Sequence, residues 1–205
     1  MNSHSAFFPM LVNLQGRKCV VVGAGNVAAD KIAGLLGLGA ELVVVSPRAV
    51  QRIRNQVRTG ALIWRRRAFR EQDVEGAFLV IAATSSSRIN EAVFQASKIR
   101  GILCNAADDP DHCDFFYPAI VRRGQLQIAI STGGSSPALA SRLRRELEQQ
   151  FGSEWGAWVD HLGELRRELL AKKMSPATRK RRLLQIASPN AFRAFLRRQD
   201  RPVSR

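Results

Sequence analysis

The residues best suited to chemistry begin with a glycine-rich turn near the N-terminus. Gly23, Gly25 and Ala28 follow a run of three valines and precede a segment with helical apolar spacing. Gly23 allows a sharp reversal, Gly25 lets a pyrophosphate approach the backbone, and Ala28 lets the helix pack closely on the strand. The free N–H groups at the start of that helix then face the phosphates. Because the turn stands directly between a strand and a helix, the pattern predicts a dinucleotide site.

A carboxylate follows a later apolar strand and is the main candidate for catalysis. Asp108 comes shortly after Asn105, where that strand ends. With an ordinary pKa of about 3.9, it is ionised at neutral pH. It can accept a proton while a hydride leaves for a cofactor, and it can stabilise the positive charge left behind. The alternative is plain turn formation, which Asp-Pro clusters favour.

Two further polar loops have spacing that suits ligand binding. Thr84 opens a hydroxyl cluster at the end of an apolar strand, and ligands in parallel sheets bind beyond such ends. Capping of the next helix by Ser86 or Ser87 is the alternative. The second loop, 131–137, is rich in glycine and leads into a helix that Ser136 is expected to cap. This loop is either a second anion site or a simple turn.

The loop after the second predicted strand bears on the choice of cofactor. Domains that prefer NAD often place an acid there to hold the ribose hydroxyls. This chain has Ser46, Pro47 and Arg48 instead. Arg48 can meet the 2′-phosphate of NADP, or it is an exposed loop charge. The residues alone therefore leave NAD and NADP both open.

The elements that must position these residues alternate along the first half of the chain. Apolar runs predict strands at 18–22, 41–45, 62–64, 77–83 and 102–105. Helical spacing between them predicts a helix from 27 to about 38 that Gly39 stops, a second that starts at 50 and closes near Gly60, and a third that starts at 89 and ends at Gly101. Strands 117–121 and 126–130 form a predicted hairpin, which basic helices follow. This order predicts an α/β fold with a Rossmann-type doubly wound parallel sheet, a β-hairpin region and a small helical C-terminal domain.

Length, composition and charge limit the number of domains and the kind of partner. The chain has 205 residues, of which 45% are hydrophobic, enough for a core. We predict a cofactor domain over 1–116, a dimerisation region over 117–152 and a basic helical domain over 153–205. The formal net charge of +15 predicts attraction to a polyanion, either a nucleic acid or a small molecule with many carboxylates. A solvated basic face without a specific partner is the alternative.

The three cysteines and the hydropathy indicate the cellular compartment of the protein. Cys19 and Cys104 lie in apolar strand contexts, so we expect buried free thiols. Cys113 stands beside His112, but neighbouring residues seldom bind one ion together, so no metal site is expected. No apolar run approaches the roughly 20 residues of a membrane helix. We therefore expect a cytoplasmic protein that makes no membrane contact.

Several motifs in combination are much more specific than the glycine turn alone. They are Phe8–Leu14, Gly23–Ala28 with Lys31, Ala82–Thr84, Asn105–Asp109, Phe116–Ile120 and Ser131–Ala140. Together they resemble the precorrin-2 dehydrogenase family, the oxidase–chelatase part of siroheme synthase. The similarity covers residues 7 to 170 in order. The methyltransferase domain fused to many members is missing, so we expect a stand-alone form.

This resemblance implies an NAD-dependent oxidation of precorrin-2 to sirohydrochlorin in siroheme biosynthesis, with ferrous iron insertion as a second activity in some members. Family members are homodimers. The family's catalytic aspartate falls on Asp108. Its cofactor contacts fall on Asn26, Val27, Pro47 and Arg48, in addition to the glycine turn and Thr84. We expect the carboxylates of the substrate to meet later arginines and the loop residues Thr132, Gly133, Gly134 and Ser135.

Two other functions fit parts of the sequence. The basic tail also suits a nucleic-acid-binding protein that senses NAD(H) through its Rossmann domain. No winged helix or other reader element is evident, so nucleic acid is not expected as the main partner. A chelatase that has lost the dehydrogenase step is the other alternative.

Overall fold

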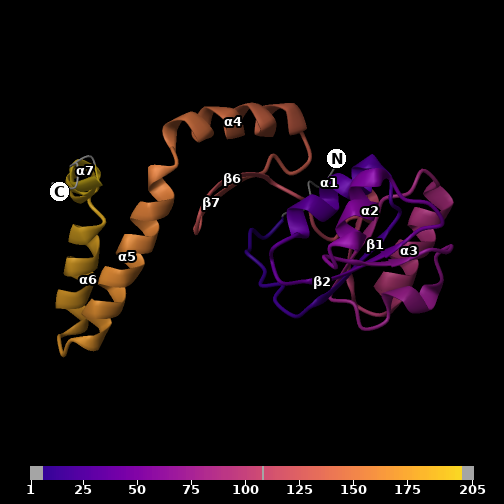
Figure 1. Ribbon diagram of the computed structural model, residues 1–205, viewed down its shortest axis with the longest axis horizontal. Helices are drawn as coiled ribbons and strands as arrows, with labels where there is room; N and C mark the ends of the chain where they lie inside the picture. Colours follow the sequence, from indigo (N-terminus) through magenta and orange to yellow (C-terminus); the bar gives the residue numbers. More distant parts are fainter. Residues whose placement is uncertain (1–6, 108, 200–205) are drawn as a thin grey trace, which may run out of the picture. The chain divides into compact units, whose positions relative to one another are not determined.

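The computed structural model describes residues 7–107 and 109–199 (Figure 1). The chain divides into two compact units, the first extending to Phe116 and the second beginning at Tyr117. No helix in the described part is long and apolar enough to cross a membrane.

The first unit is built on a five-stranded parallel sheet in the order β3-β2-β1-β4-β5. The strands are β1 (Lys18–Val22), β2 (Glu41–Val45), β3 (Ile63–Arg65), β4 (Leu79–Ala82) and β5 (Leu103–Ala106). Strand order reverses at β1, which is the arrangement of a doubly wound Rossmann sheet and places the ligand crevice at that reversal. The predicted fold class is confirmed for this unit.

Helices connect the strands and cover the sheet. They are α1 (Asn26–Leu35), α2 (Gln51–Arg58) and α3 (Ser87–Ile99), with short 3-10 helices η1 (Glu71–Val74) and η2 (Pro110–His112). Right-handed crossovers place α1 and α2 on one face of such a sheet and α3 on the other. Because both faces are covered, Val20, Val44 and Val80 are fully buried in the middle of their strands.

The predicted end of the first helix is wrong. The helix was expected to reach Leu38 and stop at Gly39, but α1 ends at Leu35. Gly37 and Gly39 have φ values of 75° and 74°, in the left-handed region where glycine carries no steric penalty. Two left-handed glycines so close together turn the chain before another helical turn can form.

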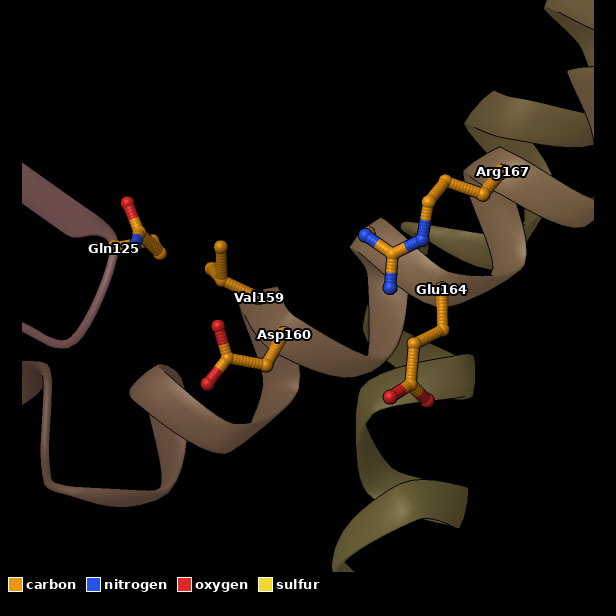
Figure 2. A pocket seen from close by; sticks show the side chains of 6 residues that line it. Gln125, Val159, Asp160, Glu164 and Arg167 are labelled. Carbon is orange, nitrogen blue, oxygen red and sulfur yellow. The ribbon is translucent and has the colours of Figure 1, made fainter.

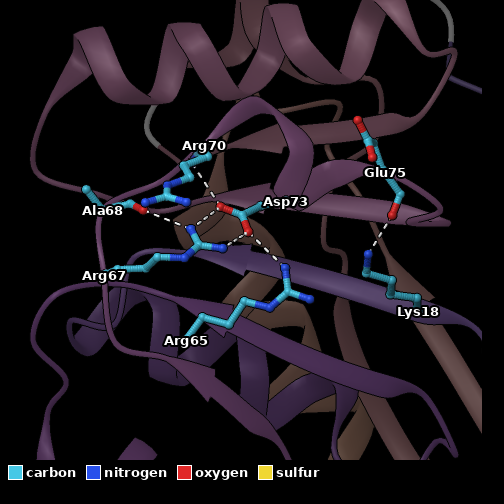
Figure 3. Close-up of polar contacts among 7 residues, drawn as sticks. All are labelled: Lys18, Arg65, Arg67, Ala68, Arg70, Asp73 and Glu75. Carbon is cyan, nitrogen blue, oxygen red and sulfur yellow. Dashed lines mark hydrogen bonds and ion pairs between the residues drawn. The ribbon is translucent and has the colours of Figure 1, made fainter.

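Asp73 in η1 ties the end of β3 to the body of the first unit (Figure 3). Its side chain is 1% exposed, and its Oδ1 lies 2.8 Å from Arg65 Nη1. Arg67 Nη1 donates to Asp73 Oδ2 at 2.7 Å, and the backbone N–H of Arg70 donates to the same oxygen at 2.9 Å. Burial by itself raises the pKa of Asp73, but these hydrogen bonds outweigh it and lower the pKa to about 2.

Asp73→Asn is expected to lower the free energy of unfolding at neutral pH by about 2–3 kcal/mol, since it leaves two guanidiniums without their anion. The folded pKa lies below the unfolded value of about 3.9, so ionised Asp73 stabilises the fold above that pH. The contribution is lost as the pH falls from about 4 to about 2. Urea unfolding of both proteins at several pH values checks this. A stability difference that did not shrink in acid would contradict it.

The second unit contains an antiparallel hairpin and four helices (Figure 1). They are β6 (Ala119–Arg123), β7 (Leu126–Ile130), α4 (Pro137–Gln150), α5 (Glu154–Ala171), α6 (Pro176–Ile186) and α7 (Pro189–Gln199). Ser136 and Ser175 cap α4 and α6 and each is followed by proline, and the cap at Ser136 is as the sequence predicted. The first strand of the hairpin was expected at 117–121 but spans Ala119–Arg123; it continues to Arg123 because Arg122 and Arg123 pair with β7 and only Gly124 and Gln125 form the turn.

Candidate cofactor and active site

The glycine turn joins the carboxyl ends of three strands. Gly23 donates its backbone N–H to Val45 O at 2.9 Å, and Ala83 N–H donates to Val22 O at 2.8 Å. Gly23 has a φ of 108°, and a Cβ placed on it would lie 2.2 Å from Ala83 O. Only glycine fits here, because β1 and the segment after β4 approach too closely for any side chain.

Gly25 shapes the space in front of α1. Gly25 is the N-cap residue of α1. Because it has no side chain, it gives no side-chain hydrogen bond to the first N–H groups of the helix. A Cβ added to Gly25 would meet no heavy atom within 4 Å, so the space before it is open among the described residues. Asn26 and Val27 are exposed beside this space, whereas Ala28 is completely buried against the sheet. Uncapped N–H groups facing open space fit the pyrophosphate of a dinucleotide.

The loop after β2 lies at the same edge of the sheet and carries no acid. Ser46 N–H donates to Arg65 O at 3.2 Å, and Trp64 Nε1 donates to Ser46 O at 2.9 Å. The Ser46 hydroxyl donates to Arg48 O at 2.7 Å, which holds the turn through Pro47. The side chain of Arg48 is exposed. Its two predicted roles, contact with the 2′-phosphate of NADP and an exposed loop charge, therefore both stay open.

The end of β4 is held by a side-chain network. Thr84 Oγ1 lies 2.8 Å from Asn90 Oδ1 and accepts from Ser86 N–H at 3.2 Å. Ser86 caps α3 by accepting from Ile89 N–H at 3.4 Å, so the capping alternative is confirmed for Ser86. The Thr84 hydroxyl thus has a local structural role. A contact between Thr84 and the cofactor stays a prediction.

The end of β5 leads into the loop of the predicted catalytic residue. Ala107 N–H donates to Ala82 O at 2.7 Å, which places this loop beside the end of β4. Asp108 itself lies outside the described residues, so its position and role stay predictions. Asn105 is 3% exposed, and its Nδ2 donates to Phe115 O at 2.8 Å and contacts Cys113 Sγ at 3.2 Å. The loop therefore returns along β5 and is anchored on both sides of Asp108 in the sequence.

All three cysteines are free thiols. Burial raises the pKa of Cys19 to about 11 and that of Cys104 to about 12, so both stay neutral. The prediction of buried free thiols is confirmed for these two. No group of three His, Cys, Asp or Glu side chains in the described part of the chain is arranged to hold a metal ion.

Sequence reasoning missed His112, a residue of this loop that bridges one carboxylate of the loop and one of α3. His112 Nδ1 lies 2.6 Å from Asp109 Oδ2, and its Nε2 lies 2.7 Å from Glu91 Oε2 on α3. The ring also packs against Phe94, with centroids 4.7 Å apart. The hydrogen bond to Asp109 raises the pKa of His112, and the charges of Glu91 and Asp111 add to this rise. Only the Asp109–His112 spacing is visible in the sequence, since Glu91 lies 21 positions before His112.

His112→Gln is expected to destabilise the protein most in mildly acidic solution. A protonated imidazole donates to both carboxylates, whereas a neutral ring donates to only one. Because the folded pKa is raised, the stabilisation is complete below the ordinary value of about 6.5 and is lost as the pH rises through the raised pKa. Melting temperatures of both proteins between about pH 5 and pH 9 test this.

His161→Gln is the control for this titration. His161 packs on Phe195 and has no ion pair with any described residue. A constant difference between wild type and His112→Gln across the pH range would show that the bridge does not titrate.

The second glycine loop belongs to the second unit and is ordered by its own hydrogen bonds. Thr132 Oγ1 accepts from Ser136 N–H at 3.0 Å, and Thr132 O accepts from Ser135 N–H at 3.1 Å. Gly133 and Gly134 have φ values of 61° and 86° and are exposed, as Ser135 is. The loop is thus a turn into a capped helix. Its binding of a substrate anion stays a prediction.

The second unit also contains an open pocket of about 470 Å³ (Figure 2). The hairpin turn and α5 line it through Gln125, Val159, Asp160, Gly163, Glu164 and Arg167. Figure 2 shows carboxylates and a guanidinium along one helix, with one aliphatic side chain among them. Ligand pockets are mostly apolar with a few polar groups, so we assign no part of the reaction to this one.

Known proteins match this chain along most of its length. The NAD(P)-binding family NAD_binding_7 matches residues 10–119, and the family described as sirohaem biosynthesis protein central matches residues 123–150. The siroheme synthase of Neisseria meningitidis serogroup C (strain 053442) is 35% identical over 194 residues, covering 95% of this chain and 40% of that protein. This chain belongs to the NAD(P)-binding family shared by siroheme synthases and precorrin-2 dehydrogenases.

One solved structure agrees with the fold along nearly the whole chain. SirC, a precorrin-2 dehydrogenase, matches with a TM-score of 0.77 and 29% identity, covering 94% of this chain and 98% of that chain. The siroheme synthase of Nitrosococcus oceani is 38% identical over 150 residues, which is 73% of this chain and 32% of that protein. The chain thus spans only about a third to two fifths of the curated siroheme synthases that it matches.

Proposed function

We propose that this protein oxidises precorrin-2 to sirohydrochlorin with NAD as the hydride acceptor, in the biosynthesis of siroheme. The observation that carries the proposal is the open, uncapped start of α1 at Gly25, on the same sheet edge as the loop after β5. The end-to-end structural similarity to SirC, a precorrin-2 dehydrogenase, supports the choice of reaction.

The cofactor is held by backbone and small side chains of the first unit. Gly25 leaves the approach open, Gly23 lets the turn pass close to Ala83, and the N–H groups of Asn26 and Val27 bind the pyrophosphate. NAD supplies an acceptor for the hydride when it is bound. We propose that Thr84, which follows β4, contacts the nicotinamide end of the dinucleotide.

Pro47 and Arg48 contact the adenosine end of NAD in this proposal. Arg48 is exposed, and no acid follows β2. The ribose is then held without a carboxylate, and a cation at this point also tolerates a 2′-phosphate. We propose NAD as the working cofactor. Comparing kcat/KM with NAD and with NADP tests this choice.

Asp108 completes the reaction by accepting a proton. Oxidation of precorrin-2 removes two hydrogens, one as a hydride and the other as a proton. A carboxylate beside the carbon that loses its hydride stabilises the positive charge that develops there. It then takes the proton that restores neutrality. The neighbouring described residues Ala107 and Asn105 are anchored to Ala82 O and Phe115 O, at the ends of β4 and β5.

The substrate carries acetate and propionate arms, so its recognition is a problem of many carboxylates. The formal net charge of +15 attracts such a polyanion and speeds its arrival. We propose that the loop of half-buried Thr132 and exposed Gly133, Gly134 and Ser135 binds some of these arms through N–H and hydroxyl groups.

We further propose a cytoplasmic homodimer joined through the hairpin region. A two-stranded sheet is marginally stable by itself, and Leu126, Ile128 and Ile130 on β7 are only half-buried. Ile120 on β6 is 36% exposed. A second copy would cover these apolar side chains. Free thiols are typical of a reducing compartment, which supports the cytoplasm.

The test is an anaerobic assay with purified protein, NAD and enzymatically prepared precorrin-2. We expect one NADH for each sirohydrochlorin formed, with both followed by their absorbance. Iron insertion is measured in a second reaction that starts from sirohydrochlorin and ferrous iron without NAD. Iron insertion without NADH formation would replace the proposal by the chelatase alternative. If the protein neither forms NADH nor inserts iron, both the dehydrogenase and the chelatase assignments are wrong.

A further inference from the structure

The positive charges of the second unit are concentrated at its C-terminal helices. Between Leu169 and Gln199 the chain has nine basic residues and no aspartate or glutamate. The nine are Lys172, Lys173, Arg179, Lys180, Arg181, Arg182, Arg193, Arg197 and Arg198. Seven of them lie on α6 and α7, whose combined length is 22 residues. We call the side chains of these seven the α6–α7 basic face.

Among the described residues, the basic face has no acidic partner in an ion pair. Its members are exposed except Arg179, which is half-buried. None of them forms an ion pair with another residue within 7–107 or 109–199. Arg193 donates to the neutral Asn190 at 2.5 Å. These cations are therefore free to meet an outside anion.

Helix α4 of the same unit shows the opposite arrangement. Arg142 pairs with Glu146 at 3.3 Å and Arg144 pairs with Glu148 at 2.6 Å, both with i,i+4 spacing. On α7 the same spacing joins Arg193 to another cation, Arg197. Like charges at this spacing destabilise a helix by a few tenths of a kcal/mol. An anion bound across them removes that repulsion.

Packing of α7 keeps its basic side chains at the surface. Phe192 stacks near Trp155 with centroids 4.5 Å apart, and Phe195 lies 5.0 Å from Trp158. Both tryptophans lie on α5. The apolar side of α7 is thus used within the unit, and the arginines are left facing solvent.

We propose that the α6–α7 basic face binds the phosphate backbone of duplex nucleic acid. Each helix has 11 residues and spans about 16 Å, a length along which a duplex presents several phosphates. Backbone binding needs no reader element, since phosphate contacts carry no sequence information. A membrane surface fits less well, because Leu184 is the one large apolar side chain exposed on the described parts of α6 and α7, and membrane-surface helices bury an apolar face.

The test is fluorescence anisotropy with a labelled duplex of about 20 base pairs, titrated at several salt concentrations. We expect Arg193→Glu with Arg197→Glu to weaken binding at least about tenfold and to reduce the salt slope by about 2. The matched control is Arg54→Glu with Arg58→Glu, which has the same spacing on α2 of the first unit and the same net charge. Circular dichroism checks the fold, and the two glutamine substitutions replace the glutamates if helix content falls.

The outcomes are distinct. Loss of duplex binding in the α7 variant but not in the α2 variant supports the proposal. An equal loss in both overturns it, since the general charge of the protein would then explain binding. Binding to phosphatidylserine vesicles but not to the duplex, with loss in the α7 variant, would assign the face to membranes instead. No duplex binding by wild type at about 50 mM salt also overturns the proposal.

Discussion

Asp108→Asn is expected to reduce kcat for precorrin-2 oxidation by at least about 100-fold, because proton transfer by a positioned side chain contributes at least this much. The amide keeps the size of the side chain but neither accepts the proton nor stabilises the positive charge. Affinity for NAD is expected to stay unchanged, since the N–H groups that bind it belong to α1. Steady-state kinetics and equilibrium binding of NAD measure the two effects separately.

Asp111→Asn is the matched control for this substitution. Asp111 lies in the same loop, in η2, and is exposed. We expect its removal to change kcat by less than about threefold, as is usual for a surface substitution. Equal activities of wild type and Asp108→Asn would exclude Asp108 as the base. Equal losses in the two variants would point to the charge of the loop as a whole.

Gly23→Ala is expected to destabilise the protein by more than about 4 kcal/mol, which is exceptional for one methyl group. The new Cβ would lie 2.2 Å from Ala83 O and 2.6 Å from Ala83 C, both backbone atoms of the segment directly after β4. The φ of 108° adds strain for any residue with a Cβ. Thermal unfolding should show a large fall in Tm, or the protein should fail to accumulate in folded form.

Gly25→Ala separates binding from folding at the same turn. Gly25 has an ordinary φ of −82°, and a Cβ there meets nothing within 4 Å. We expect an unchanged Tm and NAD binding at least about tenfold weaker, or 1.4 kcal/mol, because the methyl group fills the space in front of α1. Normal NAD affinity in folded Gly25→Ala would contradict the placement of the pyrophosphate.

Parts of the fold were predictable because their causes are local. Strands β1 and β2 have the bounds that their valine runs predict, since fully buried parallel strands are continuous apolar runs. The Ser136 cap was also predictable, because a serine followed by proline is a local signal for the start of a helix. The end of α1 was not predictable, because Gly37 and Gly39 both suit the end of a helix and only tertiary packing decides which of them ends it.

Contacts between distant residues escaped prediction. The pairing of Asp73 with Arg65 depends on how η1 returns to the end of β3, and nothing in the spacing indicates it. The bridge from His112 to Glu91 depends on the position of α3 against the loop after β5. A sequence shows which side chains can ionise, but the tertiary fold decides which of them meet.

The most direct test of the account is a crystal structure of the protein with NAD bound. We predict the pyrophosphate against the N–H groups of Asn26 and Val27, in the space before Gly25, and the nicotinamide ring beside the ends of β4 and β5 with the Asp108 carboxylate next to it. A dinucleotide bound elsewhere, or a nicotinamide ring remote from Asp108, would contradict the proposed active site.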